Sequence, residues 1–186
     1  MLETEPSNLE ARRLLNEVVA ATRIEEQFAS ALQRHRSQQF LDAQRIYLEV
    51  LAANPRHYGA NYLLGVLCLQ AGQYQAADTY LARATELNPK AATAHNNRGH
   101  ALRGLKRYDE ALVCYEKAIG VKPDFVQAMN NRGVTLRALG RIDEALASFD
   151  EALTLKPNFA KAISNRNQLL PLPRDRLSSV DDVDTL

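Results

Sequence analysis

The amino-acid sequence predicts an all-α fold, a right-handed α-solenoid built of stacked helix hairpins. The first observation is an interval of 34 residues between identical residues in two columns: Pro55, Pro89, Pro123 and Pro157, and Ala43, Ala77, Ala111 and Ala145. The second observation is the spacing of apolar residues inside each copy, which follows the helical period. Helical units of this length stack so that each buries its apolar face on the next.

The elements of one copy can be read in the fourth, over residues 126–159. Leu136 and Leu139 end its first helix, Gly140 breaks the helix, and the second helix ends at Pro157. A further column of small residues lies in the first helix of each copy: Ala31, Gly65, Gly99 and Gly133. Because only a minimal side chain lets two backbones approach closely, we expect this column where the helices cross.

These columns resemble those of the tetratricopeptide repeat (TPR) family, and the likeness extends over residues 24–170. The resemblance implies a TPR domain made of repeats 24–57, 58–91, 92–125 and 126–159 and a capping helix at 160–170. In the capping helix, Asn167 stands where the earlier copies have glycine, because no second helix follows that would require a close approach. Pro171 then prevents a further helical turn.

The segments on either side of the array, residues 1–23 and 171–186, do not follow the repeat. Ser7 and Glu10 fit a helix capping box. Four apolar residues predict an amphipathic N-terminal helix over residues 8–22: Leu14, Leu15, Val18 and Val19. This helix is either a cap packed on the first hairpin, or a segment that lies in the groove or pairs two chains. The C-terminal tail is polar and acidic toward its end, which predicts disorder.

Composition and charge exclude several classes of partner. The chain has 186 residues and a formal net charge of +1, with basic and acidic residues interspersed, so nucleic acid is not an expected partner. No run approaches the roughly 20 apolar residues of a membrane span, and the N-terminus lacks a secretory signal, so we expect a cytoplasmic protein without a membrane partner. Cys68 and Cys114 lie in apolar helical patterns without metal-ligand spacing, so we expect buried thiols, no metal and no cofactor.

The resemblance implies that partners bind on the concave surface, which in TPR proteins is lined by the first helix of each hairpin. The partner-binding residues then form an apolar half, Tyr62, Val66 and Leu69, and an amide-rich and basic half, Asn96, Asn97, His100, Arg103, Asn130, Asn131, Arg137 and Asn165. Arg103 and Arg137 lie one repeat apart and could hold a carboxylate by bidentate contacts. The alternative is that both are ordinary solvated arginines.

Asn97, Asn131 and Asn165 recur at the repeat interval. A carboxamide both donates and accepts hydrogen bonds, so such a ladder can pair with the backbone of an extended peptide of any sequence. These three residues are similar to the asparagine ladder in the TPR region of O-linked N-acetylglucosamine transferases. The alternative is structural, with the amides bridging neighbouring helices through hydrogen bonds.

No motif supports catalysis, because the sequence has neither a Gly-rich phosphate loop between a strand and a helix nor a nucleophile elbow. We therefore expect a chain that is not an enzyme but a protein-interaction module, an adaptor or scaffold that binds a partner peptide or helix in the groove. The alternative is the substrate-binding TPR arm of a glycosyltransferase resembling O-linked N-acetylglucosamine transferase, with the catalytic domain absent from this chain. A further interpretation is a homo-oligomer formed through the N-terminal helix or the apolar half of the groove.

Overall fold

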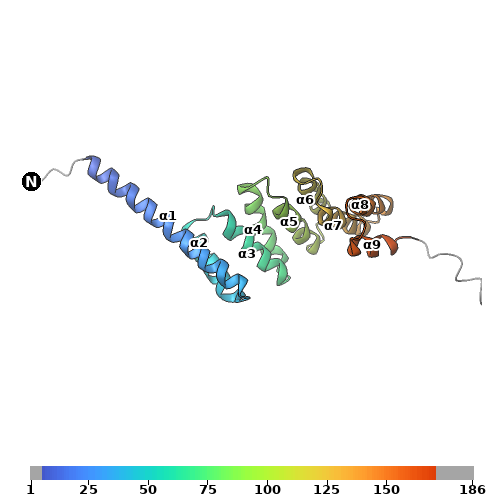
Figure 1. Cartoon of the computed structure of the whole chain (residues 1–186), viewed down its shortest axis with the longest axis horizontal. Helices are drawn as coiled ribbons and strands as arrows, with labels where there is room; N and C mark the ends of the chain where they lie inside the picture. Colours follow the sequence, from blue (N-terminus) through green and yellow to red (C-terminus); the bar gives the residue numbers. More distant parts are fainter. Residues whose placement is uncertain (1–5, 171–186) are drawn as a thin grey trace, which may run out of the picture.

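A computed structural model describes residues 6–170, and these residues form α-helices joined by short turns, with no β-strand among them. The helices in chain order are α1 (Pro6–Arg36), α2 (Phe40–Ala53), α3 (Tyr58–Gln70), α4 (Tyr74–Leu87), α5 (Ala92–Gly104), α6 (Tyr108–Val121), α7 (Val126–Ala138), α8 (Ile142–Leu155) and α9 (Ala160–Asn167). They follow one another along the long axis of the molecule (Figure 1). The predicted all-α solenoid is therefore confirmed.

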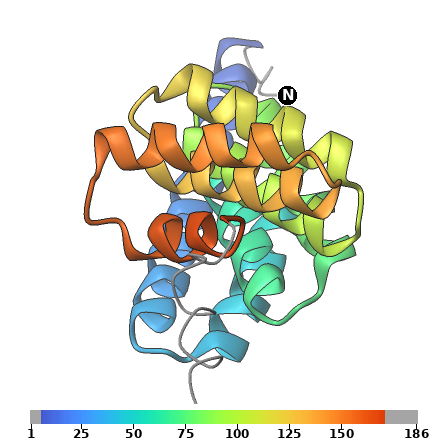
Figure 2. The ribbon, with the colours of Figure 1, turned by 90° about the vertical axis from the view of Figure 1, so that its right-hand side faces the viewer.

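The helices form two layers. Each odd-numbered helix from α1 to α7 packs against the helix that follows it as an antiparallel hairpin. Figure 2 looks along the array from its C-terminal end, with α8 and α9 in front. In addition, α3 contacts α5, α5 contacts α7 and α7 contacts α9. These four helices, which we call the inner helices, therefore line the concave side of the array, and α4, α6 and α8 lie outside them.

The small-residue column marks the helix crossings, as expected. A Cβ atom added at Gly65 would lie 2.6 Å from the Leu81 side chain, and one at Gly133 would lie 2.6 Å from the ring of Phe149. Gly99 has the same relation to Tyr115, at 2.7 Å. Helices α3, α5 and α7 therefore each rest their backbone directly on a large buried side chain of the second helix of the hairpin.

Helix α1 corrects the prediction for the N-terminal segment. The helix runs unbroken through residues 8–22 and into the first hairpin, because no glycine or proline lies between Pro6 and Arg36 to interrupt it. Ile24 and Phe28 pack against the core, whereas residues 9–23 are exposed. The interpretation of this segment as a cap packed on the first hairpin is therefore wrong.

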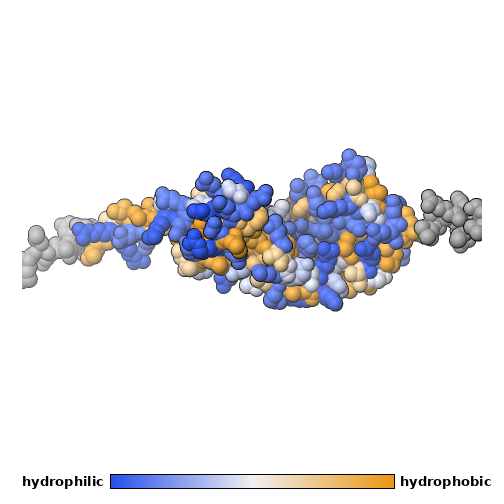
Figure 3. Space-filling view, turned by 90° about the horizontal axis from the view of Figure 1, so that it is seen from below, coloured by the Kyte–Doolittle hydropathy of each residue, from blue (hydrophilic) through white to orange (hydrophobic). Residues whose placement is uncertain are grey.

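The part of α1 that precedes Ile24 projects from the array (Figure 1) and presents apolar side chains to its surroundings (Figure 3). Leu14, Leu15, Val18 and Val19 are 56–62% exposed. This apolar stripe therefore has no partner among the residues that the structure describes. The side chain of Ser7, to which the capping box was assigned, lies outside the described side chains.

The C-terminal end of the array is shorter than predicted. Helix α9 ends at Asn167, three residues before the predicted end of the capping helix. Its Ala162 is buried against α7 and α8, and Lys161, Asn167 and Gln168 are exposed, so polar side chains cover much of the last helix. The predicted disordered tail, residues 171–186, lies outside the described residues.

Candidate partner-binding surface

The apolar half of the concave surface is formed by α3. Tyr62, Val66 and Leu69 lie one turn apart along this helix, so their side chains share one face. All three are half-buried. The ring of Tyr62 stacks on that of Tyr58, with centroids 6.0 Å apart, and burial raises the pKa of Tyr58. Tyr62, Val66 and Leu69, which the sequence analysis proposed as partner-binding, therefore form one apolar face of α3, which we call the apolar shelf.

The amide half is organised by hydrogen bonds that cross from one inner helix to the next. Three such bonds repeat with a separation of 35 residues: Asn97 Nδ2 donates to Tyr62 Oη (3.3 Å), Asn131 Nδ2 to Asn96 Oδ1 (2.9 Å), and Asn165 Nδ2 to Asn130 Oδ1 (2.9 Å). We call this row the amide ladder. The structural alternative for the asparagines is thus present in the molecule, because each ladder amide joins two helices.

The ladder divides the predicted asparagines into two groups. Asn96 is 9% exposed and Asn130 is 5% exposed, so their amides lie beneath the surface as acceptors for the next helix. Asn131 and Asn165 are half-buried, and each uses one amide N–H in the ladder. Their carbonyl oxygens and second N–H groups have no hydrogen bond within residues 6–170, so these amides can still donate and accept.

Two basic side chains of this half, Arg103 and Lys161, lie near His100. Burial lowers the pKa of His100, and the positive charges of Arg103 and Lys161 lower it further. Lys161 comes from α9 and was not among the residues that sequence analysis selected. The signal that could have identified it is a lysine within the predicted capping helix, residues 160–170. Arg137 donates from Nη1 to Gln168 Oε1 (2.8 Å) and has no carboxylate partner within residues 6–170.

From α3 to α9, the acidic residues of the helices lie in the outer layer alone. The inner helices α3, α5, α7 and α9 contain no Asp or Glu, whereas the outer helices carry carboxylates on every one. Three arginines of the inner helices reach outward to these acids: Arg98 to Asp78, Arg132 to Glu151 and Arg166 to Asp150. The ion pairs within residues 6–170 do not include Arg103, Arg137 or Lys161.

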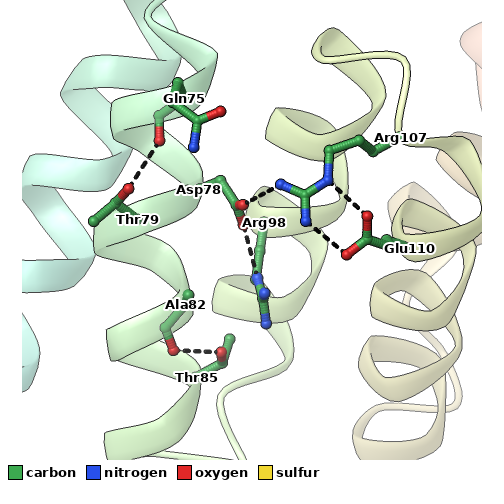
Figure 4. Close-up of polar contacts among 8 residues, drawn as sticks. All are labelled: Gln75, Asp78, Thr79, Ala82, Thr85, Arg98, Arg107 and Glu110. Atoms are coloured by element: carbon green, nitrogen blue, oxygen red, sulfur yellow. Dashed lines mark hydrogen bonds and ion pairs between the residues drawn. The ribbon is translucent and has the colours of Figure 1, made fainter.

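The junction between the apolar and amide halves is held by a buried carboxylate (Figure 4). Asp78 of α4, with a side chain 9% exposed, accepts from Arg98 Nε of α5 and from Arg107 Nη1 of the following turn, both at 2.9 Å. Arg107 also pairs with Glu110 at 2.6 Å. Asp78 stands in a column whose other members are Gln44, Leu112 and Leu146, so repeat analysis gave no signal for it.

Other kinds of site find little support in the part of the chain that the structure describes. Its His, Cys, Asp and Glu residues form no group of three that could hold a metal ion. None of its helices combines the length and the apolar character needed to cross a membrane. Cys68 and Cys114 are free thiols, buried as expected, and burial raises the pKa of both.

Comparison with known families decides what this array is. Two family models, each described as tetratricopeptide repeat, match residues 92–125, 126–159 and 34–98. The chain belongs to the tetratricopeptide repeat family. The matches to residues 92–125 and 126–159 coincide with the hairpins α5–α6 and α7–α8 and the turns that follow them.

One curated relative is anaphase-promoting complex subunit 3 of Schizosaccharomyces pombe (strain 972 / ATCC 24843). The two proteins are 30% identical over 95 residues, which are 50% of this chain and 14% of that protein. The TPR chain therefore matches only a small part of this relative's length. The likeness is one of repeat sequence, and the activity of the larger protein does not follow from it.

Two solved structures have a similar fold. The protein YrrB, described as a TPR protein with an unusual peptide-binding site, superposes with a TM-score of 0.72 at 24% identity and covers 76% of this chain and 73% of its own. MamA of Desulfovibrio magneticus RS-1 gives a TM-score of 0.69 at 20% identity, covering 73% and 77%. At these identities the likeness is evidence for the fold alone.

Proposed function

We propose that this TPR chain is a non-catalytic protein-interaction module that binds an extended segment of a partner protein on its concave surface. The observation that carries the proposal is the unfinished hydrogen bonding of Asn131 and Asn165. The amide ladder fixes their side chains in a row at the repeat interval, and each keeps an acceptor and a donor that residues 6–170 do not use. An extended peptide presents backbone N–H and C=O groups that can complete these pairs.

The apolar half supplies the second part of the interaction. Tyr62, Val66 and Leu69 offer half-buried side chains on which an apolar side chain of the partner can bury its surface. Backbone pairing at the ladder gives affinity without sequence selectivity, whereas the shelf on α3 selects for an apolar anchor. The description of YrrB as a peptide-binding TPR protein supports this use of the fold.

The asparagines do not favour the glycosyltransferase alternative. The only residues that suggested it were Asn97, Asn131 and Asn165. Because their amides join neighbouring inner helices, a role in packing accounts for their recurrence at the repeat interval. We prefer the adaptor proposal to the glycosyltransferase alternative, because an adaptor requires only the TPR array and no catalytic domain.

A pull-down from a lysate of the source organism tests the proposal. Val66→Glu places a charge on the concave shelf, and Val113→Glu places the same charge on the outer helix α6, where Val113 is 48% exposed. We expect a discrete partner to be retained by the wild type and by Val113→Glu and lost by Val66→Glu, with circular dichroism confirming that both variants are folded. Equal retention by both variants would contradict binding on the concave surface.

The exposed stripe of α1 supports a separate proposal for oligomeric state. Leu14, Leu15 and Val18 lie on one side of a helix that projects beyond the array, and a second copy offers an identical stripe. Two such helices pair by burying apolar side chains between them. We expect a dimer in sedimentation of the wild type and a monomer for Leu15→Glu/Val18→Glu; a wild-type monomer would refute the pairing.

A further inference from the structure

The concave surface has an excess of positive charge that the folded array does not neutralise. The inner helices carry no carboxylate, and their outward-facing arginines use the acids of the outer layer. Arg103, Arg137 and Lys161 remain without an ion pair in the described part of the chain, and His100 lies among them. We call these four residues the basic platform. Uncompensated charges on a concave surface attract a segment of opposite charge.

The platform combines charge with unused hydrogen-bonding groups. Arg103 and Arg137 lie one repeat apart on the inner helices α5 and α7. The amides of Asn131 on α7 and Asn165 on α9 have carbonyl oxygens that accept no hydrogen bond within residues 6–170. An extended acidic segment satisfies both features, because its carboxylates pair with the guanidinium groups while its backbone N–H groups meet the amide oxygens.

We propose that the occupant of the basic platform is the acidic stretch of this same chain, residues 177–186. This inference rests on the proposed use of the concave surface for binding an extended segment. The stretch contains Asp181, Asp182 and Asp184 and no Lys, Arg or His. Residues 1–10 are also acidic, but they include the start of α1, at the end of the array opposite α9, so the C-terminal stretch is the acidic one next to the platform. A partner's acidic segment would compete with it for the same side chains.

The length of the connection is sufficient for docking within one chain. Helix α9 carries Lys161, so the platform begins on the last helix before the tail. From Leu170 to Asp181 an extended chain spans up to about 35 Å. Helix α5, which carries Arg103, lies two helix spacings of about 8–10 Å each from α9. The acidic stretch can therefore reach every member of the platform.

Paramagnetic relaxation in the full chain tests this proposal. A spin label is attached at Ser179→Cys, where it reacts in preference to the buried Cys68 and Cys114. We expect the backbone amide signals of Arg103, Asn131 and Val134 to weaken about twofold or more, and to recover in about 0.5 M NaCl, where the Debye length falls below about 5 Å.

Two variants with the same change of charge separate a specific site from general attraction. Arg103→Glu/Arg137→Glu/Lys161→Glu removes the platform, and Lys90→Glu/Lys106→Glu/Lys117→Glu changes three exposed lysines outside the inner face. We expect the weakening to disappear in the first variant and to remain in the second. Signals that stay unchanged in the wild type, or that weaken equally in both variants, would overturn the proposal.

A mixed sample decides whether the occupant belongs to the same chain. Isotope-labelled chain without a spin label is combined with spin-labelled chain of natural isotope content. No weakening in the mixture supports docking within one chain, and weakening in the mixture overturns that assignment in favour of a second copy. Loss of docking would leave the Val66→Glu pull-down result standing, so failure of this inference and failure of the proposed function are distinguishable.

Discussion

The contact between α1 and α3 and the contact between α7 and α9 occupy the same columns of the repeat but are built of different side chains. At the first junction, Phe28 of α1 packs over Gly59 of α3 and against the ring of His57, with centroids 4.4 Å apart. At the last, Asn130 of α7 stands in the column of Phe28 and accepts a hydrogen bond from Asn165 of α9. Phe28 and Asn130 share one column, so the repeat accommodates either an apolar or an amide contact there.

The difference shows where the fold and the function are encoded. The glycine contacts between the two helices of a hairpin recur in both halves and determine the fold. The contacts between inner helices change from apolar to amide along the array and determine what the concave surface offers to a partner. Under the proposed function, a partner segment that crosses both halves contacts the apolar shelf at one end and the amides and cations at the other.

The largest expected effect concerns the contact that the two halves share. Gly133→Val places side-chain atoms where a Cβ alone would already lie 2.6 Å from the Phe149 ring, so the hairpin must open. We expect the free energy of unfolding to fall by about 3 kcal/mol. Urea denaturation measures this effect.

Gly120→Ala serves as the control, because an added Cβ at Gly120 would meet no atom within 4 Å. That substitution is expected to stabilise the helix by about 0.5–1 kcal/mol. A neutral result for Gly133→Val would show that the close approach is not required.

The junction between the halves is the next target. Asp78→Asn removes the carboxylate that Arg98 and Arg107 share, and the partly exposed arginines can turn to solvent. We expect the free energy of unfolding to fall by about 2 kcal/mol. This is less than the full cost of breaking a buried ion pair, because the arginines regain solvent. Thermal unfolding measures this loss. The control is Glu110→Gln, which removes an exposed carboxylate that pairs with Arg107 alone and should have a smaller effect. Equal effects would argue against a special role for the buried acid.

A smaller effect tests whether the amide half can be converted into an apolar one. Asn131→Ala leaves the buried Oδ1 of Asn96 without its donor and should cost about 1–2 kcal/mol. The double variant Asn96→Leu/Asn131→Leu replaces both partners by apolar groups, as at the first junction, and should recover most of this loss. Chemical denaturation of the three proteins gives the comparison. A double variant less stable than Asn131→Ala would show that the amide pair cannot be replaced.

The smallest expected effect is a dependence on pH at His100. The pKa of His100 in the folded chain lies below its ordinary value of 6.5, mainly through burial and also through Arg103 and Lys161. As the pH falls below about 6.5, the unfolded chain therefore takes up the proton first and the folded state loses stability. His100→Val, which restores the residue type of Val66 and Val134, should lessen the decline in melting temperature between neutral and mildly acidic pH. An unchanged decline would contradict the role of His100.

The repeat interval predicted the hairpins because residues in one column make the same kind of contact in every copy. Helices α3, α5 and α7 begin at Tyr58, Ala92 and Val126, one repeat apart. The continuity of α1 was missed because residues 6–23 do not follow the repeat pattern. The boundary was therefore placed at residue 24, where the pattern begins, although the helix is unbroken there. The Asp78 junction was missed for the opposite reason, since a single acid in an otherwise uncharged column carries no periodic signal.

For the concave surface, the sequence predicted the position of the asparagines but not their pairing. The columns identified Asn97, Asn131 and Asn165 at equal intervals. The hydrogen bonds run instead to residues one place earlier in the preceding repeat, because neighbouring inner helices are displaced along their axes. Such a displacement depends on packing of whole helices and cannot be read from a column of identical residues.

Photo-crosslinking at both halves of the concave surface tests the central claim most directly. A benzophenone amino acid is placed at Val66 on the apolar shelf, at Arg103 on the basic platform and, as a control, at Val113 on the outer helix α6. We expect one partner protein to be captured at Val66 and at Arg103 and not at Val113. Capture at Val113 alone would show that the outer layer of the array, and not its concave surface, binds the partner.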